Sequence, residues 1–544
     1  MTGAPGLQRG SRRIGSAQMN EADMATASSD MTGAEAIIGS LADCGVAACF
    51  ANPGTSEMHL VTALDREPRI RSVLCLFEGV ATGAADGYAR MAATPALTLL
   101  HLGPGYLNGG ANIHNGRRAF VPMINLIGDH AVTHRQYDAP LASDIAALAA
   151  PNSRWLKSVD RVEDAGALAV EAFEASYGPP PGPVSLIMPA DVAWTQGATR
   201  ADGGARAGLR IADDDLIEAA GRAVAKAKRP AMIVNGTALH AGGAETLRRM
   251  EAQGVRVITD TFMARHVRGG GLYDAARLPY FAEMAVEALA DVDLLLIAGT
   301  RSPVAFFAYP NTPGAFTPKG ARTLSLGGPE TDSFDAALRL ADWLDAPMAP
   351  RLASWTRPAA GSGDKFNPHT IGMSLAHYLP EGALISDDGV TSSLPIYQAM
   401  AAGARHEWLG HTGGAIGQGM PVALGAAVAR PDVKTVCLAG DGAGMYTVQS
   451  LWTMAREKLD VLTIVFVNNA YRILKIELAR TGAGNPGPAA NSMLSLGNPD
   501  IDWVMLSESM GVGAEAVSTC AQFNDALQRA VATRGPRLIA CLIP

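Results

Sequence analysis

Short apolar runs alternate with amphipathic helical stretches along the chain from Met31 onward. Residues 34–45 (AEAIIGSLADCG) have the apolar spacing of a helix, whereas 46–54 (VAACFANPG) and 73–79 (VLCLFEG) are apolar and strand-sized. The same alternation returns further along, for example from the run PAMIVNG at 230–236. Strands separated by helices predict parallel sheets, so the pattern indicates an α/β protein.

Two stretches with several Gly and Ala residues divide this pattern, the first of them also rich in Arg. They cover residues 196–209 and 348–366 and are typical of linkers. Three α/β domains are therefore expected, at 31–195, 210–347 and 367–544. Residues 1–30 are polar and lack the apolar core of a secretory signal, so a disordered tail is expected there.

Composition and charge exclude several classes of protein. Lys and Arg number 44 and Asp and Glu 52, which gives a net charge of −8 and no basic excess for binding a nucleic acid. No apolar run is long enough to cross a bilayer, so no membrane association is expected. The six cysteines form no CxxC pair, which favours reduced thiols and a cytoplasmic location.

The segment from 435 to 471 carries the strongest chemical signal. One predicted strand ends at Gly440, Asp441 and Gly442, and the next ends at Asn468 and Asn469. One strand–helix–strand crossover separates Asp441 from Asn468, so both side chains should emerge at the carboxyl edge of adjacent parallel strands. Their oxygen atoms suit Mg²⁺, and the glycines allow a diphosphate to approach the backbone.

This arrangement resembles the cofactor motif of the thiamine diphosphate-dependent enzymes. The resemblance implies that Mg²⁺ is bound by Asp441, Asn468 and the backbone carbonyl of Ala470, with Asn469 as the alternative to Asn468. It also implies cofactor contacts by Gly440, Asp441, Gly442, Ala443, Asn468, Ala470 and Tyr471.

Two further segments match the same family. Residues 77–91 (FEGVATGAADGYARM) fit its E-x-x-A-x-x-x-A-x-G-Y-A-R pattern and make Glu78 the catalytic carboxyl that bonds to the aminopyrimidine ring. Within 412–427, Gly414 matches the glycine whose carbonyl accepts from the cofactor amino group, and Ile416 matches the apolar residue that holds the cofactor in its bent shape. Val390 and Thr391 match a stretch that binds the diphosphate.

The predicted substrate loops resemble two branches of the family. The sequence NPGTSE at 52–57 is similar to benzoylformate decarboxylases and implies that Thr55 binds the substrate carboxylate and His101 relays protons. GPG-x-x-N at 103–108 is instead similar to acetolactate synthase large subunits. Further expected substrate contacts are Phe306 and Phe307, which replace a decarboxylase histidine, and Leu474; His130 and His134 are additional histidine candidates.

The resemblance implies decarboxylation of a 2-oxo acid followed by carboligation, as in acetolactate synthase large subunits. A decarboxylase resembling benzoylformate decarboxylase, a non-catalytic cofactor-binding paralogue and a lyase acting on CoA thioesters are the alternatives. The site should form between subunits of a homodimer or a dimer of dimers, and a regulatory small subunit is left open. Because GTRSPVAFF at 299–307 departs from the family's GARFDDR, FAD is doubtful.

Overall fold

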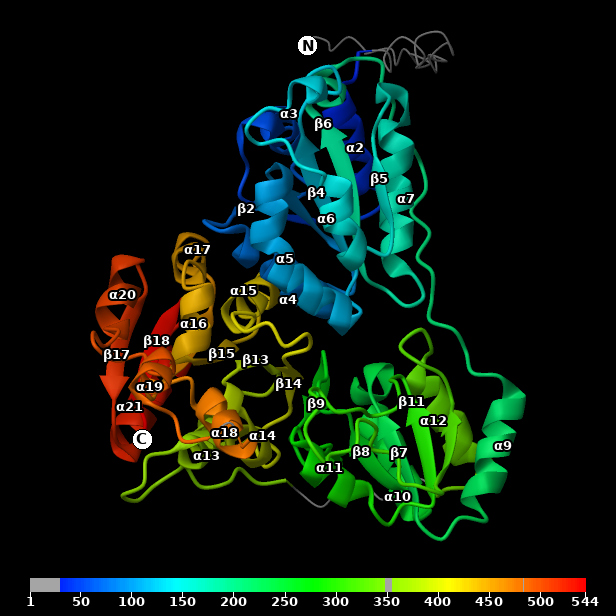
Figure 1. The fold of residues 1–544 in the computed structure, drawn as a ribbon, viewed down its shortest axis with the longest axis vertical. Coiled ribbons are helices and arrows are strands. Elements are labelled where there is room, and N and C mark those ends of the chain that lie inside the picture. Colours follow the sequence, from blue (N-terminus) through cyan, green and yellow to red (C-terminus); the bar gives the residue numbers. More distant parts are fainter. Residues whose placement is uncertain (1–29, 348–354, 483) are drawn as a thin grey trace, which may run out of the picture.

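A computed structural model describes residues 30–347, 355–482 and 484–544, which form three α/β units (Figure 1). The expected tail at 1–30 lies outside the described residues except for its last residue, and so does the part of the second predicted linker at 348–354. The mostly parallel sheets confirm the predicted fold class.

The first unit has a six-stranded parallel sheet in the order β2-β1-β3-β4-β6-β5. Its strands are β1 (Ala48–Ala51), β2 (Arg71–Leu74), β3 (Ala96–Leu100), β4 (Met123–Asp129), β5 (Leu156–Ser158) and β6 (Pro183–Pro189). Its long helices are α2 (Gly33–Asp43), α3 (Met58–Asp65), α4 (Glu78–Ala92), α5 (Leu102–Ala119) and α7 (Ala165–Tyr177). The strand order reverses between β1 and β3, and ligands bind at such reversals in parallel sheets.

The second unit has a five-stranded parallel sheet in the order β10-β8-β7-β11-β12. The strands are β7 (Pro230–Val234), β8 (Arg256–Thr259), β10 (Ala276–Arg277), β11 (Leu294–Ala298) and β12 (Arg322–Ser325). They are accompanied by α9 (Asp214–Val224), α10 (Gly243–Ala252), α11 (Ala282–Leu289) and α12 (Ser333–Trp343).

The third unit has a seven-stranded sheet in the order β17-β18-β16-β15-β13-β14-β9. Its own strands are β13 (Ala383–Asp388), β14 (His406–Leu409), β15 (Thr435–Gly440), β16 (Val461–Val467), β17 (Gly513–Val517) and β18 (Arg537–Leu542). Its strand order reverses between β13 and β15. The edge strand β9 (His266–Arg268) comes from the middle segment and runs antiparallel to β14, so the middle and third units share a sheet.

Two helices join the first and third units at very close range. Helix α4 packs against α15 (Gly419–Ala429), and glycine permits this approach. A Cβ atom on Gly87 would lie 2.0 Å from the carbonyl oxygen of Val422, and one on Gly425 would lie 1.8 Å from that of Ala84. The small residues of the 77–91 motif therefore have a packing role beside any chemical one.

Arg90, the second-last residue of that motif, links all three units. Its guanidinium pairs with Asp86 at 2.7 Å and is nearly fully buried. It also donates to the carbonyl oxygens of Ala264 and Gly410 at 2.9 and 2.8 Å. These bonds satisfy a buried charge and fix the start of the 410–418 loop.

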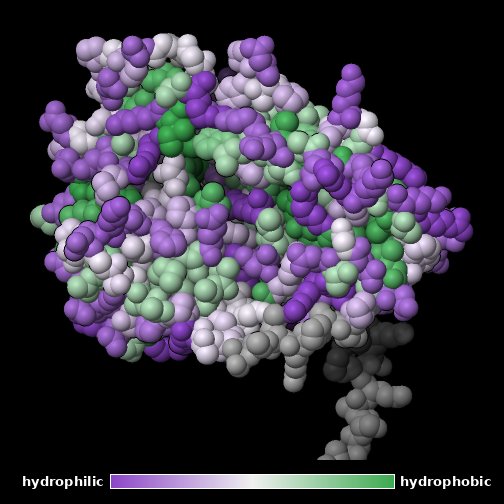
Figure 2. Space-filling model, turned by 90° about the horizontal axis from the view of Figure 1, so that it is seen from below, coloured by the Kyte–Doolittle hydropathy of each residue, from purple (hydrophilic) through white to green (hydrophobic). Residues whose placement is uncertain are grey.

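The surface carries hydrophobic groups in separate patches. Figure 2 views the molecule from below, where hydrophobic side chains lie in hollows and between hydrophilic ones. Across the described ranges, no helix combines the length and apolar character needed to cross a bilayer.

Candidate active site

Glu78 is the first residue of α4 and is buried, with 6% of its surface exposed. The amide of Asn108, on the neighbouring helix α5, donates to its Oε2 atom at 3.0 Å. The first turn of a helix favours a carboxylate, because the unpaired N–H groups there carry partial positive charge. The carboxyl is thus held through Oε2 alone, and its other oxygen, Oε1, makes no hydrogen bond in the described part of the chain.

The glycines of the 103–108 motif explain how α5 approaches this carboxyl. A Cβ atom on Gly105 would lie 3.3 Å from Oε1 of Glu78 and 3.3 Å from Cβ of His101. A Cβ atom on Gly103 would lie 1.9 Å from the hydroxyl of Ser143. A side chain at position 103 would displace the start of α5, and one at position 105 would crowd the space between Glu78 and His101.

His101 follows β3 and is held by a buried carboxyl that the sequence analysis did not single out. Its Nδ1 atom lies 2.8 Å from Oε2 of Glu57, whose side chain has no exposed surface. Oε2 also accepts from the backbone N–H of Gly54 at 2.8 Å, and Oε1 accepts from Ser56 at 2.6 Å. With Nδ1–H donating to Glu57, Nε2 is the atom left to exchange a proton.

Backbone strain and close packing surround this pair. Leu102, directly after His101, has a φ of +49°, a left-handed conformation that costs energy for leucine. A Cβ atom on Gly54 would lie 2.2 Å from the His101 ring, and one on Gly128 would lie 1.7 Å from Oε1 of Glu57. Both glycines therefore make room for the Glu57–His101 pair.

Thr55, the predicted carboxylate-binding residue, is exposed beside this pair. It begins the short 3₁₀ turn Thr55–Glu57 after β1. Its hydroxyl makes none of the hydrogen bonds that join Ser56, Glu57 and His101. Because β1 and β3 flank the reversal in strand order, residues that follow them meet at one crevice.

Asp441 forms a second group at the carboxyl edge of the third sheet. It is 3% exposed and begins the short helix α16 (Asp441–Tyr446). Oδ1 accepts from the N–H of Gly442 at 2.8 Å, and Oδ2 accepts from those of Asn468 and Asn469 at 3.0 and 2.7 Å. Burial raises the pKa of Asp441, and these N–H groups act in the opposite direction.

Asn468 and Asn469 lie in the turn after β16, next to Asp441, and differ in backbone conformation and in hydrogen bonds. Asn469 has a φ of +52°, a conformation that asparagine tolerates, and the carbonyl of Asn469 accepts from Leu496 at 2.8 Å. The side-chain oxygen of Asn468 accepts from the N–H of Ala470 at 3.0 Å. Tyr471 packs its ring where a Cβ atom on Gly442 would lie, 2.4 Å from the ring edge.

Asp388, at the end of β13, supports the glycine loop that contains Gly414 and Ile416. Its Oδ2 atom accepts from the N–H groups of Gly417 and Gly419 at 2.8 and 3.1 Å. Its Oδ1 atom is buried without a partner, and burial raises its pKa. The sequence analysis missed this residue, although it lies two positions before Val390.

Val390 and Thr391 lie just beyond Asp388. Val390 has a φ of +50°, which is a marked strain for a β-branched residue, and 39% of its surface is exposed. Strain of this kind gathers at ligand sites. Both residues belong to the 3₁₀ turn Val390–Ser392, which follows β13 at the second reversal in strand order.

Phe306 and Phe307 lie on an exposed loop of the middle unit, with 42% and 59% of their surfaces exposed. Leu474 is 46% exposed and belongs to α18 (Arg472–Arg480).

His130 and His134 follow β4, with ring centres 5.7 Å apart. Nε2 of His130 is buried without a partner beside a hollow of about 410 Å³ that Asp129 and Arg135 also line.

Comparisons with known proteins identify the family. Residues 31–148 match the description "Thiamine pyrophosphate enzyme, N-terminal TPP binding domain", and residues 391–541 match "Thiamine pyrophosphate enzyme, C-terminal TPP binding domain". The chain is 46% identical over 517 residues to "Putative acetolactate synthase large subunit IlvX" of Mycobacterium tuberculosis, covering 94% of this chain and 99% of that protein. The chain belongs to the thiamine pyrophosphate enzyme family.

Two further relatives share less of the sequence. Benzoylformate decarboxylase of Pseudomonas aeruginosa is 25% identical, with 91% of this chain and 96% of that protein covered. The structure of 4-hydroxybenzoylformate decarboxylase from Rhodococcus jostii superposes with a TM-score of 0.80 at 23% identity, covering 94% of this chain and 99% of that one. This superposition confirms the three-domain fold of the family.

The residues around Asp441 fit a thiamine pyrophosphate and Mg²⁺ site. The Asp441 carboxylate, the Asn468 amide oxygen and the Ala470 carbonyl would supply only oxygen atoms, the donor type that Mg²⁺ prefers. A Cβ atom on Gly414 would meet nothing within 4 Å, and one on Gly440 would meet only the Asp388 carbonyl at 4.0 Å, so both glycines border open space. No cluster of three or more His, Cys, Asp and Glu side chains suited to a metal exists in the described ranges.

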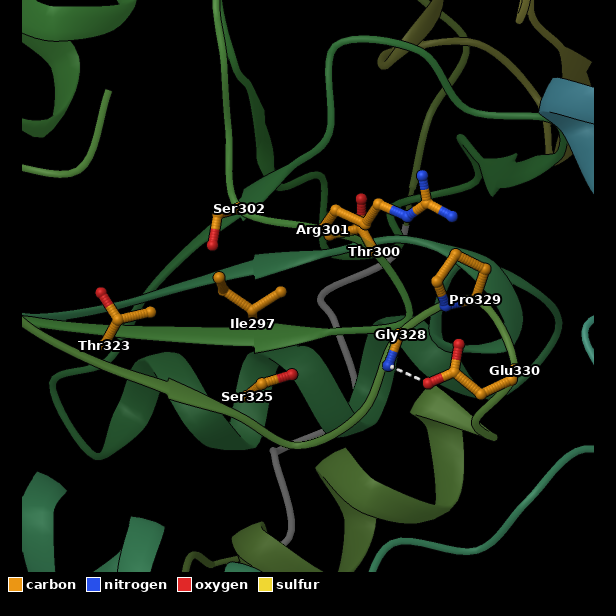
Figure 3. Close-up of a pocket in the computed structure, with 9 residues that line it drawn as sticks. All are labelled: Ile297, Thr300, Arg301, Ser302, Thr323, Ser325, Gly328, Pro329 and Glu330. Carbon is orange, nitrogen blue, oxygen red and sulfur yellow. Dashed lines mark hydrogen bonds between the residues drawn. The ribbon is translucent and has the colours of Figure 1, made fainter. Parts of the chain in front are cut away.

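The middle unit has a separate pocket, shown in Figure 3. It has a volume of about 350 Å³ and lies at the carboxyl ends of β11 and β12. Its lining residues are Ile297, Thr300, Arg301, Ser302, Thr323, Ser325, Gly328, Pro329 and Glu330. Three of them belong to the segment whose sequence departs from the family's flavin-binding pattern.

Proposed function

We propose that this protein decarboxylates a 2-oxo acid and joins the remaining acyl group to a second carbonyl compound, as an acetolactate synthase-like carboligase that requires thiamine diphosphate and Mg²⁺. The observation that carries the proposal is the buried Glu78 carboxyl, which Asn108 holds by Oε2 while Oε1 is left for a ligand. The start of α4 favours a carboxylate at this position, but it does not explain why the carboxyl is buried with one oxygen unpaired.

When bound, thiamine diphosphate supplies a carbon nucleophile that adds to the 2-oxo group and accepts the electron pair released with CO₂. Glu78 holds a proton at the pyrimidine ring nitrogen. Asp441, Asn468 and the carbonyl of Ala470 would hold Mg²⁺, and Ile416 would support the cofactor from the glycine loop. We favour Asn468 over Asn469 as the metal ligand because the left-handed backbone already accounts for an asparagine at position 469.

The remaining cofactor contacts are assigned to backbone groups and small residues. Val390 and Thr391 follow β13, and Gly440, Gly442 and Ala443 lie at the end of β15, so both sets flank the same crevice. Here the glycines allow the diphosphate to approach the chain closely.

The proposed site is completed by a second copy of the chain. Within the described part of one chain, no hydrogen bond joins Glu78 or His101 to Asp441 or Asn468. Large apolar side chains are exposed beside both groups: Leu76 46%, Leu107 59%, Met445 39%, Tyr446 54% and Leu474 46%. A homodimer, or a dimer of dimers, would cover these side chains while bringing Glu78 of one subunit to Asp441 of another.

Ligation is favoured over simple decarboxylation by the apolar loop of the middle unit. Phe306 and Phe307 cannot donate a proton, which leaves His101 as the principal proton relay. The alternative is a benzoylformate decarboxylase-like reaction, and the Glu57–His101 pair favours it because a firmly held histidine protonates a carbanion well. FAD stays doubtful, because GTRSPVAFF at 299–307 departs from the GARFDDR sequence of acetolactate synthases.

A product analysis tests this proposal. The protein loaded with cofactor and Mg²⁺ is incubated with 2-oxo acids singly and in pairs, and CO₂ is measured beside the organic products. The carboligase predicts hydroxyketones or 2-hydroxy-3-oxo acids in amounts close to the CO₂ released. Aldehyde equal to CO₂, with no ligated product from any pair, would instead identify the decarboxylase. If no substrate yields CO₂, the proposal is wrong and the result supports the non-catalytic cofactor-binding paralogue.

A further inference from the structure

Four rings form a cluster between the middle and third units, in which Phe262 also lies 6.4 Å from Tyr280. We call this cluster the aromatic row: His411, Phe262, Phe306 and Tyr280. The Phe262 ring centre lies 6.1 Å from that of His411, at an interplanar angle of 72°. It lies 4.9 Å from that of Phe306, which stacks on Tyr280 at 5.2 Å and 13°. The first pair is edge-to-face and the last is stacked, both favourable arrangements, and the Phe262 and Phe306 rings are tilted by 51°.

One end of the aromatic row is attached to the glycine loop. Nε2 of His411 lies 2.8 Å from the carbonyl oxygen of Ala415, the residue between Gly414 and Ile416. The side chain of Asn115 also bonds to both the N–H and the carbonyl of Ala415. The row therefore starts at the segment proposed to support the reactive part of the cofactor.

The loop that carries Phe306 and Phe307 is fixed a second time, to α18. The hydroxyl of Tyr309 donates to Glu477 at 2.8 Å. The guanidinium of Arg480 lies 4.1 Å from the Phe281 ring and 5.6 Å from the Tyr309 ring. Helix α18 begins directly after Tyr471, so this loop lies between two segments of the proposed cofactor site.

Phe306 and Phe307 stay partly exposed although they lie in this aromatic surrounding. With 42% and 59% of their surfaces accessible, they offer apolar area that a bound molecule can cover. Val304, on the same loop, is also 57% exposed. A flat aromatic group gains more from such rings than a saturated group of equal size, because ring pairs add to the stabilisation from buried area.

We infer that the aromatic row and Phe307 bind an aromatic side chain of the 2-oxo acid donor, so that the donor is an aryl-substituted 2-oxo acid. This inference rests on the proposed function. The 2-oxo carbon of the donor would be held at the proposed cofactor site, so the donor side chain would be the group closest to the rings that are attached at Ala415.

A matched pair of substrates tests the inference. Benzoylformate and cyclohexylglyoxylate differ in a flat against a saturated ring, and kcat/KM for CO₂ release is measured for both, with pyruvate as the small reference. Wild type should prefer benzoylformate, and Phe306→Leu should lower the benzoylformate-to-cyclohexylglyoxylate ratio about two- to tenfold. Phe334→Leu, on α12 in the same unit but outside the aromatic row, should leave the ratio unchanged.

Two outcomes would overturn the inference. One is a wild-type ratio of one or less, with pyruvate the better donor. The other is a ratio that Phe306→Leu does not move, because rings that only join the two units would alter stability and not discrimination. An aromatic preference confined to the second carbonyl compound would equally contradict a donor site.

A binding measurement separates this inference from the proposed function. Glu78→Gln protein, loaded with cofactor and Mg²⁺, is titrated calorimetrically with benzoylformate and cyclohexylglyoxylate. If no 2-oxo acid yields CO₂ with wild type, the proposed function fails. Tighter binding of the aromatic acid would then still support the aromatic site, and equal binding would reject it.

Discussion

Nδ1 of His101 lies 2.8 Å from Oε2 of Glu57, a carboxyl group without exposed surface. Glu57 directly follows Ser56, and both oxygens of its carboxyl accept hydrogen bonds. This pair fixes the ring so that Nε2 can serve the reaction. Glu57 is thus a positioning residue for His101.

Replacing Glu57 should therefore impair proton transfer. In Glu57→Gln an amide nitrogen takes the place of one acceptor oxygen and faces a donor, so the ring loses its fixed orientation. We expect kcat for product release to fall about tenfold or more, with a smaller change in KM. Ser56→Ala removes one contact of the same carboxyl and should lower kcat less. If the fraction of folded Glu57→Gln protein falls by the same factor as kcat, the role of Glu57 is purely structural.

Glu78 should be needed for turnover and not for cofactor binding. Glu78→Gln keeps the size of the side chain and the bond from Asn108 but removes the acid, so kcat should fall about 100-fold or more. Asn108→Ala should cause a smaller loss, because it frees the carboxyl without removing it. Steady-state CO₂ release measures both variants. Full activity of Glu78→Gln would contradict its assigned role.

The contact between α4 and α15 should not tolerate even a methyl group. A Cβ atom on Gly425 would lie 1.8 Å from the carbonyl oxygen of Ala84, so Gly425→Ala should lower the free energy of unfolding by about 1–3 kcal/mol or more. Gly110 on α5 is the matched control, because its Cβ atom would meet nothing within 4 Å. Gly110→Ala should be neutral, or stabilising by up to about 1 kcal/mol. Chemical denaturation of both variants compares the two values.

Buried histidines should make the shared sheet sensitive to acid. Burial lowers the pKa of His406 to about 4, and Arg268 on the adjacent strand β9 acts in the same direction. An unfolded histidine binds its proton near pH 6.5, so the stabilisation is present above that pH and is lost as the pH falls towards 4. Burial also lowers the pKa of His266, which adds to the effect.

Thermal denaturation measures this dependence. The Tm of wild type should fall between pH 7 and pH 5, and His406→Asn should flatten this part of the curve. His59→Asn changes an exposed histidine and should leave the slope as in wild type. If the slope of Tm against pH is the same in His406→Asn and wild type, groups other than His406 cause the acid sensitivity.

The part of the candidate site that lies in short local motifs could be predicted from the sequence. Glu78 and Asp441 each stand where a strand gives way to a helix, and the spacing from Asp441 to Asn468 is that of one crossover. Such features depend on a short stretch of chain, and the structure brings Asp441 and Asn468 together as expected. The fold class followed from the alternation of strands and helices for the same reason.

Contacts between distant segments could not be predicted in this way. Glu57 and His101 lie 44 residues apart, and they meet because β1 and β3 are neighbours in the sheet, which no local pattern specifies. Strand β9 has three residues and pairs with β14 far along the chain. No sequence pattern around Phe262 indicates that its ring contacts His411.

Cofactor binding by Asp441→Ala tests the central claim most directly. Wild type, Asp441→Ala and the control Asp432→Ala, an exposed residue paired with Arg430, are freed of metal and titrated calorimetrically with thiamine diphosphate. We expect wild type and Asp432→Ala to bind the cofactor only when Mg²⁺ is present, and Asp441→Ala to bind it in neither condition. Binding by Asp441→Ala as tight as that of wild type would contradict the account.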